Sequence, residues 1–111
     1  MSEFRRGVIE FLKIIGDPTR LDILDLLKGS EKSSLEIKKN LNKSQSTISK
    51  HLNMLYDNNL IEYEKKNNIK YYKIKNLNIF NLFNRINSLV AEIYKEKFKD
   101  IRDVDVRDTL T

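Results

Sequence analysis

Cysteine and tryptophan do not occur among the 111 residues of this chain, glycine occurs three times and proline once. Without cysteine the chain forms no disulfide, no thiolate metal site and no cysteine nucleophile. So few glycines also argue against a glycine-rich phosphate-binding loop. The residue pattern contains no nucleophile–base set and no pair of buried acids. We therefore expect a protein that is not an enzyme and that holds no cofactor.

Long apolar runs are missing as well. The amino terminus, Met1 to Arg6, leads into an amphipathic segment, so we expect neither a signal peptide nor a membrane span, and a cytoplasmic location. The length predicts one domain, and 40% hydrophobic with 33% charged residues indicates a globular chain. The formal net charge of +5 suits a polyanionic partner, although an ordinary basic protein has the same balance.

Apolar residues at helical spacing predict two helices near the amino terminus. The first covers about Glu3 to Ile15 and the second Thr19 to Lys28. Between them, Asp17 is a candidate cap, and Pro18 suits the first turn of the second helix because its missing N–H has no partner there. Gly29 is expected to follow the second helix as its C′ residue. The first helix has Phe4, Val8, Phe11, Leu12 and Ile15 on one side, and the second is expected to bury Leu21, Ile23, Leu24, Leu26 and Leu27.

A short helix, a tight turn and a second, polar-faced helix follow, which is a helix-turn-helix pattern. Ser33 or Ser34 caps the short helix, and Glu36, three residues after Ser33, matches a capping box. The turn is formed by Asn42-Lys43. The apolar contacts of the short helix are expected to be Leu35, Ile37 and Leu41.

The polar-faced helix, capped by Ser44 or Ser46, has two unlike sides. One side is an apolar stripe of Ile48, Leu52 and Leu55. The opposite side carries hydroxyls, amides and one cation, in Gln45, Ser46, Ser49, Lys50 and Asn53. Such groups suit base edges and phosphates in a major groove. The alternative is a solvated helix face with its N-cap, although a helix exposed only to water tends to carry long side chains of both charges.

After Asn58-Asn59 the period of the pattern changes from helical to two, which predicts strands over 60–65 and 69–74. Asn67 and Asn68 lie between them, and asparagine tolerates the left-handed backbone of a tight turn. The tip of this hairpin is basic, with Lys65, Lys66 and Lys70. Lysines there protect an exposed sheet edge, contact phosphates, or do both. A hairpin directly after a helix-turn-helix predicts a winged helix.

A last long helix is expected over about Ile79 to Lys99, with Asn76 and Asn78 as cap candidates. Its apolar positions either close a monomeric core or exceed what that core needs and form an interface. Residues 100–111 carry four acids and two arginines and are expected to be an acidic tail or an extension of the helix. The apolar stripe is Ile79, Leu82, Phe83, Ile86, Leu89, Val90, Ile93 and Phe98.

Three segments resemble the ArsR-type (ArsR/SmtB-like) winged-helix regulators. They are Gly16-Asp17-Pro18-Thr19-Arg20-Leu21-Asp22-Ile23-Leu24, Ser44-Gln45-Ser46-Thr47-Ile48-Ser49-Lys50-His51-Leu52 with the later Leu55 and Asn59-Leu60-Ile61, and Tyr71-Tyr72-Lys73-Ile74. The resemblance spans about Phe11 to Lys75, and the motifs are specific in combination. It implies a mainly α fold with a small β-hairpin, in the order α-α-α-α-β-β-α, with residues 1–99 as the DNA-binding domain.

The resemblance also implies a homodimeric, sequence-specific DNA-binding repressor that dimerises through its first and last helices. In the family the helix at 44–58 contacts bases in the major groove and the wing touches the flanking backbone. Members that sense metals use cysteines or histidines, and this chain has only His51, so metal sensing does not carry over. The glycine that the family often has at the wing tip is replaced by Asn67-Asn68. The alternative function is a winged-helix module that docks protein or RNA.

The expected partners are double-stranded DNA and a second copy of the chain. A small-molecule effector is compatible with this interpretation, and no residue pattern identifies one. Arg20 could instead pair with Asp17 or Asp22, His51 could be a packing residue, and a carboxylate-only metal site at Glu92, Glu96 or Asp100 is less favoured than a solvated helix face. The candidate DNA contacts are Arg20, Lys43, Ser44, Gln45, Ser46, Thr47, Ser49, Lys50, His51, Asn53, Lys65, Lys66, Asn67, Asn68 and Lys70. The candidate dimer contacts are Phe4, Val8, Phe11, Phe80, Phe83, Ile86, Val90, Ile93 and Tyr94.

Overall fold

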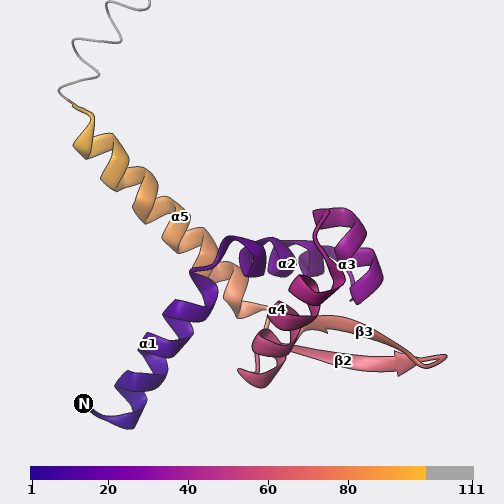
Figure 1. The fold of residues 1–111 in the computed structure, drawn as a ribbon. Coiled ribbons are helices and arrows are strands. Elements are labelled where there is room, and N and C mark those ends of the chain that lie inside the picture. Colours follow the sequence, from indigo (N-terminus) through magenta and orange to yellow (C-terminus); the bar gives the residue numbers. More distant parts are fainter. Residues whose placement is uncertain (100–111) are drawn as a thin grey trace, which may run out of the picture. The chain divides into compact units, whose positions relative to one another are not determined.

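The computed structural model describes residues 1–99, which fall into two compact units (Figure 1). The first unit is Met1–Asn76, and the second begins at Leu77. The predicted tail, residues 100–111, lies outside the described residues. Within residues 1–99, every helix is too short or too polar to cross a membrane.

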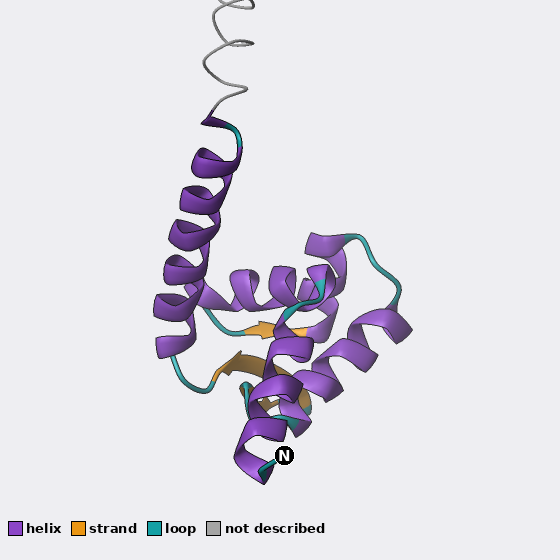
Figure 2. Ribbon diagram, turned by 90° about the vertical axis from the view of Figure 1, so that its left-hand side faces the viewer, coloured by secondary structure: helices purple, strands orange, loops and turns teal. Residues whose placement is uncertain are grey.

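Helices predominate in the first unit (Figure 2). Each of its four helices begins after a residue whose side-chain oxygen accepts a hydrogen bond from a backbone N–H three residues later, which satisfies one of the amides that a helix start leaves unpaired. The capping residues are Ser2, Asp17, Ser33 and Ser44. The helices are α1 (Glu3–Ile15), α2 (Pro18–Gly29), α3 (Ser34–Leu41) and α4 (Gln45–Asp57).

The turn between α3 and α4 is tight because Asn42 adopts a left-handed backbone, with φ of 53°, and ends α3. Ser33 rather than Ser34 caps α3, and its hydroxyl accepts from the backbone N–H of Glu36 as the capping-box pattern predicts. The same hydroxyl donates to the Glu36 carboxylate at 3.2 Å. Ser44 rather than Ser46 caps α4. The helix-turn-helix that the sequence predicts is therefore confirmed.

A three-stranded antiparallel sheet completes the first unit, in the order β1-β3-β2. Strands β2 (Ile61–Lys66) and β3 (Ile69–Ile74) form the predicted hairpin, and Asn67 and Asn68 both have positive φ, of 53° and 64°. Two such residues in a two-residue loop match the twist of the strands, so asparagine replaces glycine here. Strand β1 (Lys32–Ser33) pairs with Tyr71 and Tyr72, and its two residues are too few to give a pattern in the sequence.

One hydrophobic core connects these elements. It includes the stripe of α4 that the sequence predicts, with Ile48, Leu52 and Leu55 at most 1% exposed. Burying a leucine or isoleucine side chain stabilises a fold by about 1.5–3 kcal/mol, so this stripe holds α4 firmly in the unit. The other fully buried side chains are Ile23, Leu24, Ile37 and Ile61. Because one side of α4 is buried, its polar side is turned outward.

The structure corrects four expectations about the helices of the first unit. Leu21 and Leu35 are 36% and 52% exposed because each stands two residues before a buried isoleucine, and residues two apart on a helix point to nearly opposite sides. Leu26 is half-buried. Gly29 is the last residue of α2 and not its C′ residue, since the C-cap is Ser30.

The second unit contains α5 (Asn78–Lys97). Its N-cap position is Leu77, which makes no side-chain cap bond, and not Asn76 or Asn78 as the sequence suggests. Ile79 and Phe80 are buried, and Phe80 lies edge-on to Phe83 with ring centroids 6.0 Å apart. The remaining apolar residues of its predicted stripe are half-buried or exposed.

Candidate nucleic-acid interface

The polar candidates on α4 fall into two groups by their position around the helix. At about 100° per residue, Gln45, Ser46, Ser49, Lys50 and Asn53 lie within an arc of roughly 140° that begins beside the buried stripe and extends away from it. Of these five, all but the half-buried Ser49 are exposed. We call these five residues the polar face of α4. Thr47 and His51 lie on the flank of the helix and are half-buried.

Hydrogen bonds between residues close in the sequence order the side chains at the start of this face. The Ser44 hydroxyl accepts from the backbone N–H of Thr47 at 3.2 Å and donates to the Thr47 hydroxyl at 2.8 Å. The Gln45 side-chain amide donates to the Ser49 hydroxyl at 3.1 Å. That bond does not use the amide oxygen of Gln45. The polar face therefore presents donors and acceptors in an ordered arrangement, as contact with base edges requires.

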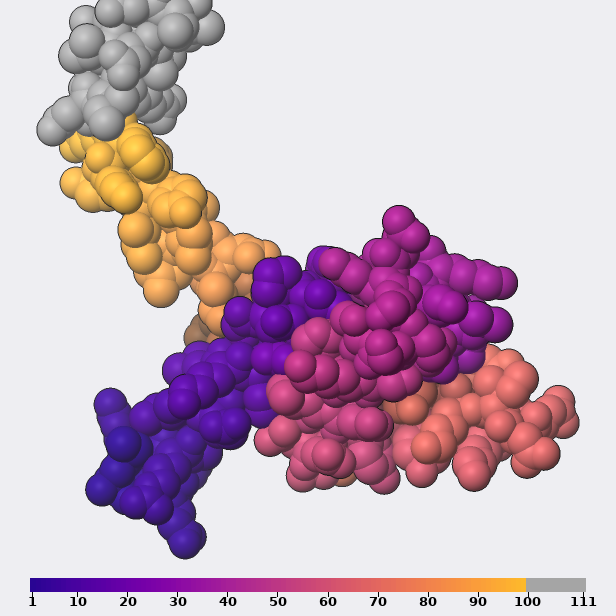
Figure 3. All heavy atoms as spheres, viewed as in Figure 1, coloured from indigo at the N-terminus to yellow at the C-terminus, as the bar shows by residue number. Residues whose placement is uncertain are grey.

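The wing contributes cations, and its base adjoins α4 (Figure 3). Lys65 pairs across the hairpin with Lys70, and both are exposed. Like charges directly opposite each other are unfavourable in a sheet, so this pair favours an anionic partner. The Lys70 ammonium lies 4.5 Å from the centroid of the Tyr63 ring. The wing candidates Asn67 and Asn68 form the exposed turn beside these lysines.

Lys66 differs from the other wing lysines because it forms an ion pair with Glu31, which precedes β1. The hydrogen bond from the Lys66 ammonium to Glu31 raises the pKa of that ammonium above its usual value. The Lys66 ammonium also lies 5.5 Å from the centroid of the Tyr71 ring. Sequence reasoning did not identify Glu31 as its partner, since the two residues are 35 positions apart.

A row of tyrosines joins α4 to the wing, and sequence reasoning did not identify it as part of the site. The ring centroids of Tyr56 and Tyr63 are 5.2 Å apart, and those of Tyr63 and Tyr72 are 5.7 Å apart. Burial raises the pKa of the Tyr72 hydroxyl. Aromatic pairs at such distances stabilise their contact beyond simple burial. The row therefore fixes the wing against the end of α4.

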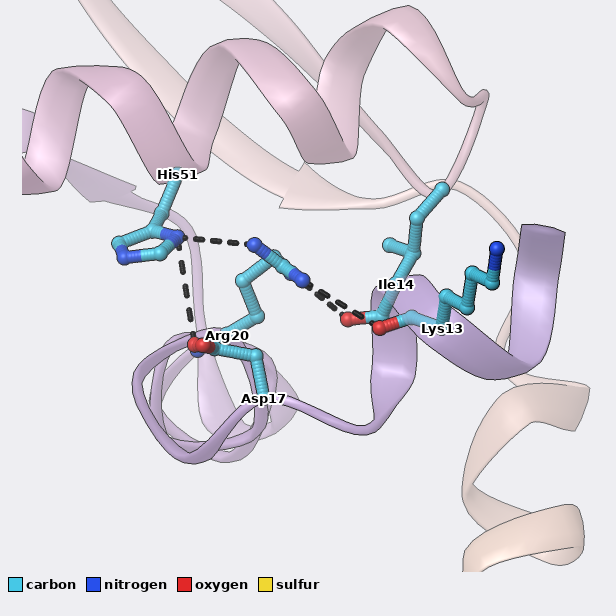
Figure 4. Close-up of polar contacts among 5 residues, drawn as sticks. All are labelled: Lys13, Ile14, Asp17, Arg20 and His51. Atoms are coloured by element: carbon cyan, nitrogen blue, oxygen red, sulfur yellow. Dashed lines mark hydrogen bonds and ion pairs between the residues drawn. The ribbon is translucent and has the colours of Figure 1, made fainter.

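Arg20 and His51 lie close to each other, away from the polar face (Figure 4). Arg20 Nη1 is 3.2 Å from His51 Nδ1, and the rest of the guanidinium donates to the carbonyl oxygens of Ile14 at 2.7 Å and Lys13 at 3.3 Å. The guanidinium hydrogen bonds thus go to carbonyls and His51; the hydrogen bond that links Arg20 to Asp17 comes from the backbone N–H of Arg20.

The surroundings of this contact lower the pKa values of both Asp17 and His51. The backbone N–H of Arg20 donates to the Asp17 carboxylate at 3.0 Å, and this bond is the main reason that the pKa of Asp17 is lowered. Burial is the main cause of the lowered pKa of His51, whose side chain is 13% exposed. The Asp17 carboxylate, 4.0 Å from His51 Nδ1, acts in the opposite direction.

Lys43, the last of the candidate DNA contacts, is exposed in the turn between α3 and α4. Among residues 1–99, histidines and acids nowhere gather in a group of three that could hold a metal ion. Asp100, one of the three acids considered for a carboxylate site, lies outside the described residues.

Comparison with known proteins identifies the class of this chain. The family described as "Bacterial regulatory protein, arsR family" matches residues 17–63, from the cap of α2 into the hairpin. The arsenical resistance operon repressor of Staphylococcus aureus is 37% identical over 83 residues, which cover 67% of this chain and 80% of that protein. The transcriptional repressor SdpR of Bacillus subtilis is 42% identical over 62 residues, covering 56% of this chain and 69% of that protein.

A solved structure has the same fold. It is a homodimeric winged helix-turn-helix DNA-binding domain from Mycobacterium bovis, 24% identical, with a TM-score of 0.73 over 86% of this chain and 93% of that one. The fold is thus a winged helix-turn-helix, as the sequence predicts. The matched relatives are regulators of transcription and not enzymes. The chain belongs to the arsR family of bacterial regulatory proteins.

Proposed function

We propose that this regulator is a homodimeric repressor whose two α4 helices contact bases in successive major grooves of one DNA duplex. The outward polar face of α4, next to a wing with exposed lysines, is the observation that carries the proposal. The relatives named as repressors favour repression over activation. A protein with this function acts in the cytoplasm.

Base contacts are assigned to the polar face of α4. An exposed glutamine can donate to and accept from adenine at once, and a lysine can donate to guanine acceptors or to phosphate. Gln45 lies in the first turn of α4, the end that contacts bases in helix-turn-helix docking. Ser46, Ser49, Lys50 and Asn53 extend this contact along the groove, and Ser44 and Thr47 support it.

Phosphate contacts are assigned to the wing and to the turn before α4. Lys65, Lys70 and Lys43 are exposed cations, and Asn67 and Asn68 add amide groups at the tip. Lys66 contributes less, because Glu31 already neutralises its charge in part. Such contacts fix the orientation of a protein on a duplex without distinguishing one sequence from another.

The dimer contacts are assigned to α1 and α5, with residues 1–99 as the functional domain. On α1, a shallow apolar groove is lined by Phe4, Gly7, Val8 and Phe11, and the side chain of Phe4 is 84% exposed. On α5, the exposed members of the predicted dimer contacts are Ile86, Val90, Ile93 and Tyr94, with Phe83 half-buried. Phe80, the ninth candidate, is 8% exposed and contributes least.

A second copy of this chain is the occupant that we assign to these faces. The winged-helix neighbour from Mycobacterium bovis is itself homodimeric. A two-fold dimer puts two recognition helices about 34 Å apart, and half-sites then repeat after roughly 10 base pairs. We assign no small-molecule effector.

Selection from a random duplex library tests the proposal. The wild-type protein should enrich a sequence with two inverted half-sites, and fluorescence anisotropy at about 150 mM salt should give at least 10³-fold tighter binding than to a scrambled duplex. Analytical ultracentrifugation should show two chains per bound duplex. A protein that binds every duplex equally would contradict the proposal and favour a module that docks protein or RNA.

A further inference from the structure

The side chain of Arg20 connects the end of α1 to the flank of α4. Its guanidinium donates to the carbonyl oxygens of Ile14 and Lys13 in the last turn of α1, and its Nη1 lies 3.2 Å from Nδ1 of His51 on α4 (Figure 4). These carbonyls are among the four that a helix end leaves unpaired, and they carry the negative end of the helix dipole. A guanidinium is therefore a favourable group at this position.

The chemistry of this contact specifies the state of the histidine. A guanidinium has only donors, so His51 Nδ1 must accept, and the ring proton then lies on Nε2. A second proton on Nδ1 would leave two donors facing each other. Burial, which lowers the pKa of His51, favours the same neutral form.

The contact between Arg20 and His51 constrains the direction in which α4 faces, which the apolar core does not. Ile48, Leu52 and Leu55 hold α4 in the unit by apolar contacts, which depend little on direction. A hydrogen bond does depend on direction. The bond from Arg20 to His51, with its anchor on α1, therefore resists rotation of α4 about its own axis, and such rotation would turn the polar face.

We propose that Arg20 and His51 are positioning residues that fix the orientation of α4 relative to the end of α1, and that they set DNA affinity without contacting DNA. This inference rests on the proposed function, because it concerns the presentation of the polar face. It reassigns two residues that the sequence suggested as DNA contacts. Both side chains already have partners within the protein, and neither belongs to the polar face.

Two substitutions at position 51 separate positioning from simple packing. His51→Asn keeps an acceptor oxygen close to the site of Nδ1, whereas His51→Leu keeps the bulk and removes the acceptor. With a duplex selected by the wild-type protein as the probe, His51→Leu should weaken binding by up to about tenfold, because without a hydrogen bond to a charged group α4 also populates orientations that do not fit the groove. His51→Asn should bind nearly as the wild type does. Equal reductions in both variants would overturn the proposal.

Arg20→Met tests the other end of the contact. Alone it should weaken binding about as much as His51→Leu, and the double variant should bind no more weakly than either single variant, because both remove the same bond. The slope of log affinity against log salt should stay unchanged. Lys65→Gln on the wing is the positive control, since removing a cation that neutralises one phosphate should reduce that slope by up to about 0.9. A reduced slope in Arg20→Met would identify Arg20 as a phosphate-binding residue and overturn the proposal.

One measurement on the wild-type protein does not depend on the folding of any variant. Nitrogen-15 NMR of the His51 ring should show a protonated Nε2 and an unprotonated Nδ1 near pH 7.5. A proton on Nδ1 would rule out the bond from Arg20. Failure of the wild type to prefer any duplex would remove the proposed function together with this inference, whereas wild-type affinity in His51→Leu would remove this inference alone.

Discussion

The polar face of α4 and the β2–β3 wing offer DNA different chemistry. The face has one cation among four uncharged groups, and its side chains bond to their own neighbours, as Gln45 does to Ser49. The wing has many cations, and three of them, Lys66, Lys70 and Lys73, lie over tyrosine rings or beside acids. Directional groups distinguish bases, whereas charge gives affinity that is independent of sequence. This difference assigns specificity to α4 and general attraction to the wing.

Replacing Gln45 by alanine should have the largest effect. If its amide pairs with a base, binding to the cognate duplex should weaken by about 1–3 kcal/mol, and preference at one base position should relax. The scrambled duplex should be bound as before. Anisotropy titrations with both duplexes measure this, and an equal reduction on the two would exclude Gln45 from base contact.

Replacing Lys65 or Lys70 by glutamine should have a smaller and more uniform effect. Each variant should bind cognate and scrambled duplexes several-fold more weakly, and the salt slope should fall by about 0.9 for each phosphate that is no longer neutralised. Titrations over a range of salt concentrations give the slope. A reduction restricted to the cognate duplex would give the wing a part in specificity and refute its assignment to general attraction.

Replacing Glu31 by glutamine should raise affinity, by about twofold or less. Lys66 is paired with Glu31, and exposed ion pairs are weak, so the release of this cation should add only a little attraction to phosphate. The salt slope should become steeper than in the wild type. The matched control is Glu36→Gln on α3, which removes one negative charge without releasing Lys66 and should change the slope less.

The smallest effect should be a dependence of stability on pH that comes from the flank of α4. His51 faces Asp17 and Arg20, with Lys43 and Lys50 nearby, and its pKa in the folded chain is lowered from 6.5. Above a pH of about 6.5 the His51 ring is neutral in both the folded and the unfolded chain. As the pH falls below that value, His51 takes up a proton first in the unfolded chain, so the free energy of unfolding decreases.

Urea unfolding at pH 7.5 and pH 5.5 measures this dependence. The wild type should be less stable at pH 5.5, and His51→Asn should show a smaller difference. Asp17, whose pKa is lowered from 3.8, reduces stability further only below that value. A pH effect of undiminished size in His51→Asn would contradict the assignment.

Local patterns in the sequence predicted most of the fold. Caps at Asp17 and Ser33, the stripe of α4 and the Asn67-Asn68 turn each depend on residues a few positions apart, and the structure confirms all of them. The β1 strand was missed because its pairing with β3 is a contact between distant segments. The α5 cap was wrong in position, since the N-cap is Leu77, and a residue type that suits a cap does not by itself fix where a helix begins.

The candidate site was predicted only in part, because some of its contacts join residues that are far apart in the sequence. Helical periodicity was enough to separate the polar face of α4 from its buried side. The ion pair between Glu31 and Lys66 and the contact between Arg20 and His51 join residues 35 and 31 positions apart. Their geometry follows from tertiary packing, which no local pattern contains.

Cross-saturation NMR of the protein–DNA complex shows which surface of the protein meets the duplex. With a deuterated protein bound to a selected duplex, saturation of the DNA protons should weaken amide signals most strongly at 44–46, 49–50 and 53 on the outward side of α4 and at 65–70 on the wing. Signals from the end of α1 and from Arg20 should stay unchanged. Weakened signals confined to other helices, with the polar face of α4 unaffected, would refute the proposal that α4 contacts the bases.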